Sequence, residues 1–322
     1  MPRPTAGTAL AASLRAVREE SWIGVAGMAV ALLRGVLALP ATAFVAAVTW
    51  LAVRQAVQGG ARPAGVLAAV AGVWASPRAR SIALGLWLAA VLVWGALRVA
   101  WVAGAMPAVA WRLSGRSGPR PAFSSGAAWR FSRVLPVAAV ALLLDLAGRV
   151  LVLLAFASAF VVGMRVQAGG GSASAAFVAA FALTTAAFLG ACLSVAGDAA
   201  VARAALGGEG PLQAIGGALL AVGRRPAAFL AAILAVAIGF ALATGAVEAF
   251  LGVMASAASR GPRSLALFPQ AIFGVATAYL AALAEAWRLG ALGVLALPAQ
   301  SGEENRWMSL RSESLGMRPP SQ

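Results

Sequence analysis

Residues Pro136–Val162 read PVAAVALLLDLAGRVLVLLAFASAFVV, an apolar run in which only Asp145 and Arg149 are charged. A helix needs about 20 mainly apolar residues to cross a bilayer, and this run is longer than that. Its apolar residues are continuous and do not alternate with polar ones, which favours a helix over a strand of a membrane barrel. The stretch therefore predicts a transmembrane helix.

Five further runs of the same kind occupy most of the chain. Hydrophobic residues make up 61% of the sequence and charged residues 11%, whereas a soluble domain carries roughly a quarter charged residues. We therefore predict an all-α, polytopic transmembrane helical bundle with about six spans. The predicted spans are Val36–Val53, Ser81–Ala103, Pro136–Val162, Ala173–Ala196, Pro226–Leu251 and Phe268–Leu289.

The distribution of arginine predicts how the spans are oriented. All 25 basic residues are Arg, and cytoplasmic loops of membrane proteins are enriched in basic residues. With both termini inside, the inner segments carry more Arg than the outer loops by about two to one. We expect a multi-pass protein of the bacterial inner membrane with both termini cytoplasmic. Its parts are then a cytoplasmic N-terminal segment (1–21), a transmembrane domain (22–298) and a disordered cytoplasmic tail (299–322).

One short apolar stretch, Gly65–Trp74, lies in the first outer loop and does not fit the pattern of spans. It is too short to cross a bilayer. The sequence leaves open whether this stretch is an interfacial helix or a re-entrant one.

The segment between the second and third spans resembles the segment between the fourth and fifth. Each begins with Val-Ala-Gly, continues through a Gly-Pro turn and an Ala/Gly-rich part, and ends with Arg shortly before Pro (Val102 to Pro136 and Val195 to Pro226). Proline suits the first turn of a helix, where its missing N–H is not needed. We infer three related helical hairpins, each made of a lead-in and two spans.

The lead-ins Ser125–Val134 and Leu212–Arg225 mix apolar and basic residues. Basic amphipathic helices of this kind lie in the headgroup layer, with Arg at anionic phosphates. We favour interfacial helices here, and the alternative is that each lead-in simply extends the following span. The candidate lipid-headgroup residues are Arg130, Arg133, Arg224 and Arg225.

The segment Val195–Ala237 combines the end of a span, Asp198, the turn Glu209-Gly210-Pro211, an Ala-rich helix, and Arg224-Arg225-Pro226 before a new span. In this plan the chain resembles a broad group of bacterial six-span membrane proteins of unknown function, and the membrane domain attached to some glycerophosphodiester phosphodiesterases. The resemblance implies the hairpin fold. The phosphodiesterase activity does not carry over, because it belongs to a soluble domain with His and acidic metal ligands.

A few ionisable residues fall within or at the ends of the predicted spans. Such residues cost about 2.5–3.5 kcal/mol each on insertion scales and therefore mark functional or paired positions. The spacing predicts two pairs within single helices, Asp145 with Arg149 and Glu285 with Arg288. Arg98 and Glu248 have no local partner, and Arg98 could pair across helices with Glu248, Asp145 or Glu285. The candidate intramembrane polar residues are Arg98, Asp145, Arg149, Glu248, Glu285 and Arg288.

A stripe of small residues on the fourth span predicts close helix packing. Ala186, Gly190 and Ser194 recur every four residues, so they share one face of the helix. Small residues on one face let a second helix approach closely in a membrane.

Residue types needed for common catalysis are missing. The chain has no His, which excludes a Ser-His-Asp triad and any zinc site that uses His. The single Cys, Cys192, lies inside a predicted span. We therefore predict no enzymatic activity, no cofactor and no metal. We expect the lipid bilayer and its anionic headgroups as partners, and no nucleic acid, because the Arg residues are spread over many loops.

Two hypotheses about function follow. The first is a non-enzymatic membrane module, transport-associated or envelope-organising, that works with a membrane-protein partner or as a homo-oligomer. The second is a transporter or permease with a polar path through the intramembrane charged residues. A transporter should line a water-accessible cavity with those residues, whereas a module should bury them as pairs and leave an apolar lateral face. Three hairpins differ from the inverted repeats common in transporters, which favours the module.

Overall fold

The computed structural model of the chain describes residues 4–114, 122–168, 172–258 and 267–297. Every regular element within these ranges is a helix, which confirms the all-α prediction. The elements are α1 (Ala6–Glu19), α2 (Trp22–Gln58), α3 (Pro63–Ala75), α4 (Pro77–Leu113), α5 (Phe123–Gln167), α6 (Ala173–Ala202), the π-helix η1 (Arg203–Gly207), α7 (Pro211–Arg224), α8 (Pro226–Ala258) and α9 (Leu267–Ala296).

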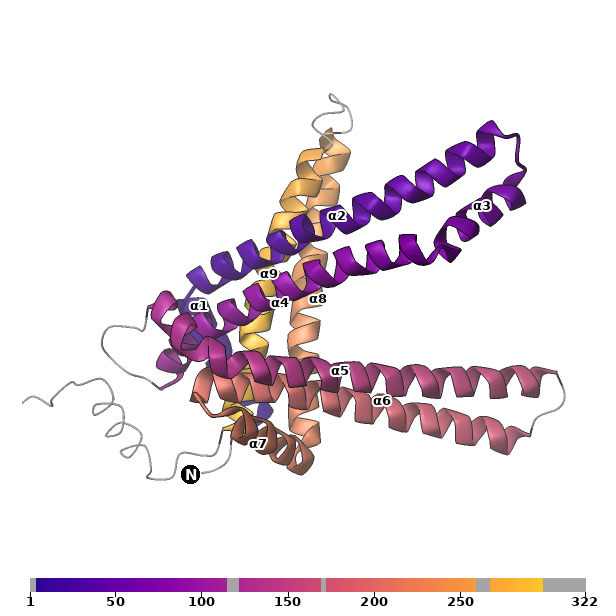
Figure 1. Cartoon of the computed structure of the whole chain (residues 1–322). Helices are drawn as coiled ribbons and strands as arrows, with labels where there is room; N and C mark the ends of the chain where they lie inside the picture. The colour runs from indigo at the N-terminus through magenta and orange to yellow at the C-terminus, as the bar shows by residue number, and fades with distance from the viewer. Residues whose placement is uncertain (1–3, 115–121, 169–171, 259–266, 298–322) are drawn as a thin grey trace, which may run out of the picture.

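The long helices form three hairpins that diverge from a common base (Figure 1). One hairpin is made of α2 and α4 with α3 at its tip, the second of α5 and α6, and the third of α8 and α9. Within the described residues, 6 helices are long and apolar enough to cross a membrane. The prediction of a six-span helical membrane protein built from hairpins is therefore confirmed.

The buried core lies at the base of the hairpins, in a cluster that we call the hub. The hub consists of α1, η1, α7 and the adjoining ends of α2, α4, α5, α6, α8 and α9. Beyond it the hairpins bury little of their apolar surface: the most apolar window of α4 is only 6% buried, against 44% for α9. α9 is the central helix, since it packs against α1, α2, α4, α6, α7 and α8.

The helix α1 belongs to the hub and packs against the last helix. Its start is capped by Thr5, whose hydroxyl accepts a hydrogen bond from the backbone N–H of Thr8. On the buried face, Ser13 donates to the carbonyl of Trp287 (2.7 Å), and the Trp287 indole donates to the carbonyl of Leu10 (3.0 Å). The helix α1 is thus tied to the last span, and both described ends of the chain lie at the hub.

The two lead-ins behave differently. Ser125–Val134 is the first part of the continuous helix α5, so the prediction of a separate interfacial helix is wrong there and the alternative holds. Leu212–Arg225 corresponds to a separate helix, α7, which buries Ala214, Ala218 and Val222 in the hub. The difference arises at the proline. Pro136 lies inside α5, whereas before Pro226 the backbone of Arg225 turns to φ −144° and ψ 54° and starts a new helix.

The short apolar stretch Gly65–Trp74 forms most of α3, which has no buried residue. This helix is shorter than a span. It packs against both α2 and α4, and the Trp74 indole donates to the Thr49 hydroxyl on α2 (3.2 Å). The stretch therefore forms part of the tip of the first hairpin, and the number of spans stays at six.

The small-residue stripe on α6 packs closely against a second helix, as the sequence predicted. Gly190 faces Gly148 of α5, and a Cβ on Gly148 would lie 2.8 Å from the Gly190 carbonyl oxygen. A Cβ on Gly190 would lie 2.9 Å from the Gly148 carbonyl oxygen. Because both contacts involve backbone, they leave no room for a side chain, and this pair of glycines sets the distance between α5 and α6.

We expect Gly190→Leu to lower the free energy of unfolding by roughly 1–3 kcal/mol, because overpacking forces the two helices apart. Thermal unfolding of the detergent-solubilised protein measures the change. Gly163→Leu is the matched control, since that glycine also lies in the α5–α6 hairpin but has open space around it. Equal melting temperatures for the two variants would contradict the packing assignment.

Candidate functional site

Charged side chains gather where the hairpins leave the hub, and we call this group the charged belt. Its members come from α2, α4, α5, α6 and α9, so all but α8 of the six long helices contribute. The members are Arg34, Arg98, Asp145, Arg149, Asp198, Glu285 and Arg288.

The first contact of the charged belt joins α4 to α9. The Arg98 guanidinium donates to the Glu285 carboxylate at 2.6 Å, with side chains 34% and 23% exposed. Arg98 also lies 5.9 Å from the centre of the Trp94 ring, and Arg34 of α2 approaches the same ring at 4.9 Å. Of the three partners considered for Arg98, the structure selects Glu285.

The second contact joins α9 to α6, because Arg288 pairs with Asp198 at 3.3 Å. The predicted pair of Glu285 with Arg288 is therefore wrong. Residues three apart on a helix are rotated by about 60° from each other. Since α9 lies between α4 and α6, that rotation is enough to aim the two side chains at different neighbours.

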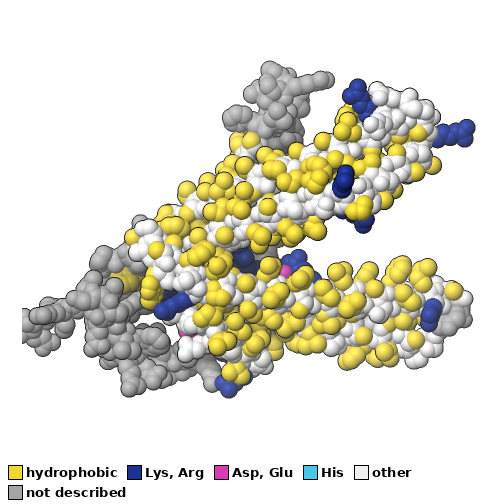
Figure 2. All heavy atoms as spheres, in the orientation of Figure 1, with side chains coloured by type: hydrophobic (Ala, Val, Ile, Leu, Met, Phe, Trp, Pro, Cys, Tyr) yellow, Lys and Arg dark blue, Asp and Glu magenta, His cyan; other side chains and the backbone are white. Residues whose placement is uncertain are grey.

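The third contact lies on the second hairpin and confirms the predicted pair of Asp145 with Arg149 (2.9 Å). The Ser194 hydroxyl of α6 donates a hydrogen bond to Asp145 (2.9 Å). These three side chains line a cavity of about 430 Å³ beside the two glycines of the helix contact. Figure 2 shows basic and acidic side chains together on this hairpin, at the side that faces the first hairpin.

The three contacts form one electrostatic group. Asp198 and Asp145 both lie close enough to Arg98 to interact with it through space, in addition to its direct partner Glu285. Salt bridges thus link α4 to α9 and α9 to α6, and the acids of α5 and α6 lie within electrostatic range of Arg98. The charged belt therefore connects all three hairpins through three ion pairs, and its seventh member, Arg34, contacts the Trp94 ring.

Glu248 does not belong to the charged belt. It is exposed on α8, about 22 residues or about 33 Å along that helix from its first residue, Pro226. This position is near the tip of the third hairpin, so Glu248 and Arg98 do not face each other.

Most of the candidate lipid-headgroup residues donate hydrogen bonds to backbone carbonyls of the protein itself. Arg130 is buried and donates to the backbone carbonyls of Ala205 and Leu206 at the end of η1. Arg133 donates to the carbonyl of Gly208 (2.7 Å). The last carbonyls of a helix lack partners within the helix and attract cations. The assignment of Arg130 to headgroups is therefore wrong, because its guanidinium caps a helix end.

Of the other two candidates, Arg224 is the last residue of α7 and Arg225 follows it, and only one of them bonds within the protein. Arg225 donates to the carbonyl of Leu295 near the end of α9 (2.9 Å) and to that of Pro4 (3.4 Å). It therefore holds the two described ends of the chain together. Arg224 is exposed and stays a predicted headgroup contact.

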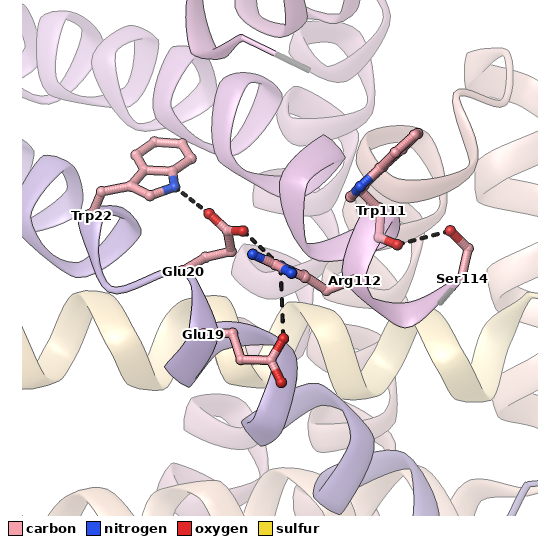
Figure 3. A network of polar contacts seen from close by, with 6 residues as sticks. All are labelled: Glu19, Glu20, Trp22, Trp111, Arg112 and Ser114. Atoms are coloured by element: carbon pink, nitrogen blue, oxygen red, sulfur yellow. Dashed lines mark hydrogen bonds and ion pairs between the residues drawn. The ribbon is translucent and has the colours of Figure 1, made fainter. Parts of the chain in front are cut away.

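Two groups of polar contacts in the hub, around Glu20 and around Arg203, were not predicted from the sequence. Glu20 is buried and accepts hydrogen bonds from the Arg112 guanidinium (2.8 Å) and the Trp22 indole (2.6 Å), as Figure 3 shows. Arg203 pairs with Glu209 at 2.8 Å and also donates to the carbonyl of Ala296. The bond from Arg112 to Glu20 and the bond from Arg203 to Ala296 join residues more than 90 positions apart, so they depend on how the helices cross.

No group of three or more metal-ligating side chains occurs in the part of the chain that the structure describes. Comparison with known proteins found no matching family model, no matching curated protein and no matching solved structure. The resemblance to the membrane domain of glycerophosphodiester phosphodiesterases therefore stays a prediction.

Proposed function

We propose that this protein is a non-enzymatic membrane module whose diverging hairpins hold the transmembrane helices of a partner protein. The observation that carries the proposal is the contrast between the hub and the hairpins. Apart from Arg34, which contacts the Trp94 ring, the members of the charged belt are paired with one another, whereas the lateral faces of the hairpins are apolar and exposed. Figure 2 shows hydrophobic side chains along both hairpins that are visible there.

The spacing of arginines supports this placement in the membrane. On three long helices, two arginines bound an apolar run: Arg34 and Arg54 on α2, Arg80 and Arg98 on α4, and Arg149 and Arg165 on α5. Along each helix the two are about 24–30 Å apart. The hydrocarbon core of a bilayer is about 30 Å thick. We therefore place the hairpins in the hydrocarbon and the charged belt at one membrane surface.

The hub then lies at the membrane surface that carries more arginine, which the positive-inside rule makes the cytoplasmic one. Both described ends of the chain lie in the hub, which agrees with cytoplasmic termini. The bacterial inner membrane remains our expected location.

A cysteine placed at Ala168, next to a hairpin tip, should react with an impermeant maleimide from outside the cell, and one placed at Leu212 in α7 should not.

The exposed lateral faces are what a partner would contact. Leu142 and Leu153 on α5 are 63% and 65% exposed, and Leu92 on α4 is 72% exposed. Transmembrane helices associate through packing of such surfaces and through small residues. The diverging hairpins leave these faces uncovered within the chain itself, so a partner helix can pack against them.

The test is crosslinking from the lateral faces in intact cells. A photoreactive phenylalanine analogue placed at Leu92 or Leu153 is expected to give one adduct of discrete mass. The captured protein should give the same adduct in the reciprocal experiment. Leu212, on the exposed side of α7, is the control position and should not give that adduct. Adducts with lipid alone, from both hairpin positions, would overturn the module hypothesis.

A transporter is the second candidate, and the cavity beside Asp145, Arg149 and Ser194 is the observation that favours it. Its charges are paired, which argues against a free ion path. In vesicles containing the purified protein, flux that is lost in Asp145→Asn but kept in Glu209→Gln would favour transport.

A further inference from the structure

A groove of about 780 Å³ runs between α2 and α4 in the outer half of the first hairpin, next to α3. Its volume is within the range of roughly 300–1,000 Å³ that is typical of small-molecule sites. The groove exists because small side chains face one another there, among them Ala41, Ala46 and Ala83. The lining residues are Ala41, Thr42, Val45, Ala46, Thr49, Trp50, Val53, Trp74, Arg80, Ala83, Leu84 and Trp87.

The groove is as long as one leaflet of a bilayer. From Ala41 to Val53 the helix α2 rises about 18 Å. Half of the hydrocarbon core of a bilayer is about 15 Å. A transmembrane helix that packed along this hairpin would need a contact surface across both leaflets, whereas an acyl chain needs only one. The length of the groove therefore favours a lipid over a partner helix.

One end of the groove is polar and basic. Arg80 lines the groove next to the break between α3 and α4, and its guanidinium donates one hydrogen bond to the carbonyl of Ala75 (2.9 Å). A guanidinium has five N–H donors, so others can bind an anion. Arg54 and Arg78 are exposed near the same end. A phosphate oxygen matches this geometry, because guanidinium and phosphate form paired, charge-assisted hydrogen bonds.

Aromatic side chains mark the same end of the groove as the level of the headgroups. Trp50 and Trp74 line the groove toward this end, whereas Trp87 lies about 10 Å further along α4 from Arg80. Tryptophan is enriched where hydrocarbon meets headgroups. The hydrogen bond from the Trp74 indole to the Thr49 hydroxyl holds α3 against α2, so that Trp74 stays in place as part of the groove lining. The groove thus has an apolar floor one leaflet deep and a cationic mouth at headgroup level.

We propose that this groove binds one anionic glycerophospholipid of the leaflet at the hairpin tips. The acyl chain lies along α2 and α4, and the phosphate contacts Arg80. The proposal does not depend on the module function, since a transporter with the same hairpin would carry the same site.

The test uses the full chain in phosphatidylcholine vesicles that contain a small fraction of phosphatidylglycerol with a photoreactive acyl chain. Peptide mapping after illumination should find adducts in 41–53 and 80–87 in clear excess over the exposed face of α5 at 153–164. Arg80→Gln should reduce this labelling roughly fivefold, the contribution of one basic residue at a membrane surface. Ala46→Phe should abolish it, because the added ring fills the groove.

The matched control is Arg165→Gln, which removes an arginine at the tip of the second hairpin and should leave the groove labelling unchanged. Size-exclusion profiles and helical content check that each variant is folded. Equal labelling of both hairpins in the wild-type protein would overturn the proposal. Groove peptides that stay unlabelled, as they would with a second copy of the chain in the groove, would also overturn it. Labelling that persists in Arg80→Gln would overturn the phosphate contact.

Discussion

Glu285→Leu is expected to lower the free energy of unfolding by about 2–3 kcal/mol, because it leaves Arg98 without its partner in the charged belt. Breaking a fully buried ion pair costs about 3–5 kcal/mol, and the partial exposure of both side chains reduces that figure. Since the pair joins α4 to α9, the loss also loosens the first hairpin from the central helix. Denaturation in mixed detergent micelles, followed by tryptophan fluorescence, measures the change.

The double variant Arg98→Met with Glu285→Leu separates charge from packing. It should regain most of the lost stability, because two apolar side chains leave no unpaired charge. The control is Arg149→Met, whose side chain is 73% exposed and pairs within one helix. That change should cost less than about 1 kcal/mol. Additive losses in the double variant would show that the two side chains do not act as a pair.

Glu20→Leu is expected to destabilise the protein by about 2–4 kcal/mol, which is the other large effect. The Glu20 carboxylate is buried and accepts hydrogen bonds from Arg112 and Trp22, so it links the turn between α1 and α2 to the end of α4. Its loss leaves a guanidinium and an indole N–H with one partner fewer, and hydrogen bonds to charged groups contribute about 1.5–3 kcal/mol each.

The neighbouring residue supplies the control for this prediction. Glu19 lies 3.7 Å from the same guanidinium, but its side chain is 48% exposed. Glu19→Leu should therefore change stability by less than about 1 kcal/mol. Melting temperatures measured at one detergent concentration compare the two variants directly. A larger loss for Glu19→Leu than for Glu20→Leu would contradict the assigned network.

The fold was predictable to the level of spans and hairpins because those features depend on local composition. Apolar length predicts the six long helices, and the pairing of Asp145 with Arg149 follows from spacing on one helix. The contact between Gly148 and Gly190 was predicted only in part. The small-residue stripe predicted that another helix approaches α6 closely, but it did not predict that this helix is α5.

The polar contacts between helices were harder to predict, because they depend on which helices are neighbours. Glu285 and Arg288 look like partners in the sequence, yet each contacts a different helix. Arg130 looks like a surface residue in a basic lead-in, yet it caps a helix end formed about 75 residues later in the chain. In both cases the partner lies on a helix far away in the sequence, so no local pattern predicts the contact.

The packing of α1 on α9 has a consequence for synthesis of the chain. The Ser13 hydroxyl and the Trp287 carbonyl that it contacts are 274 residues apart. At about 5–20 residues per second, a ribosome needs roughly 14–55 s to make the second residue after the first. Throughout that time the buried face of α1, including Ala9 and Val17, has no α9 to cover it. Of the helices that the structure describes, α1 thus waits longest for its main neighbour, and the hub is complete only once α9 has been made.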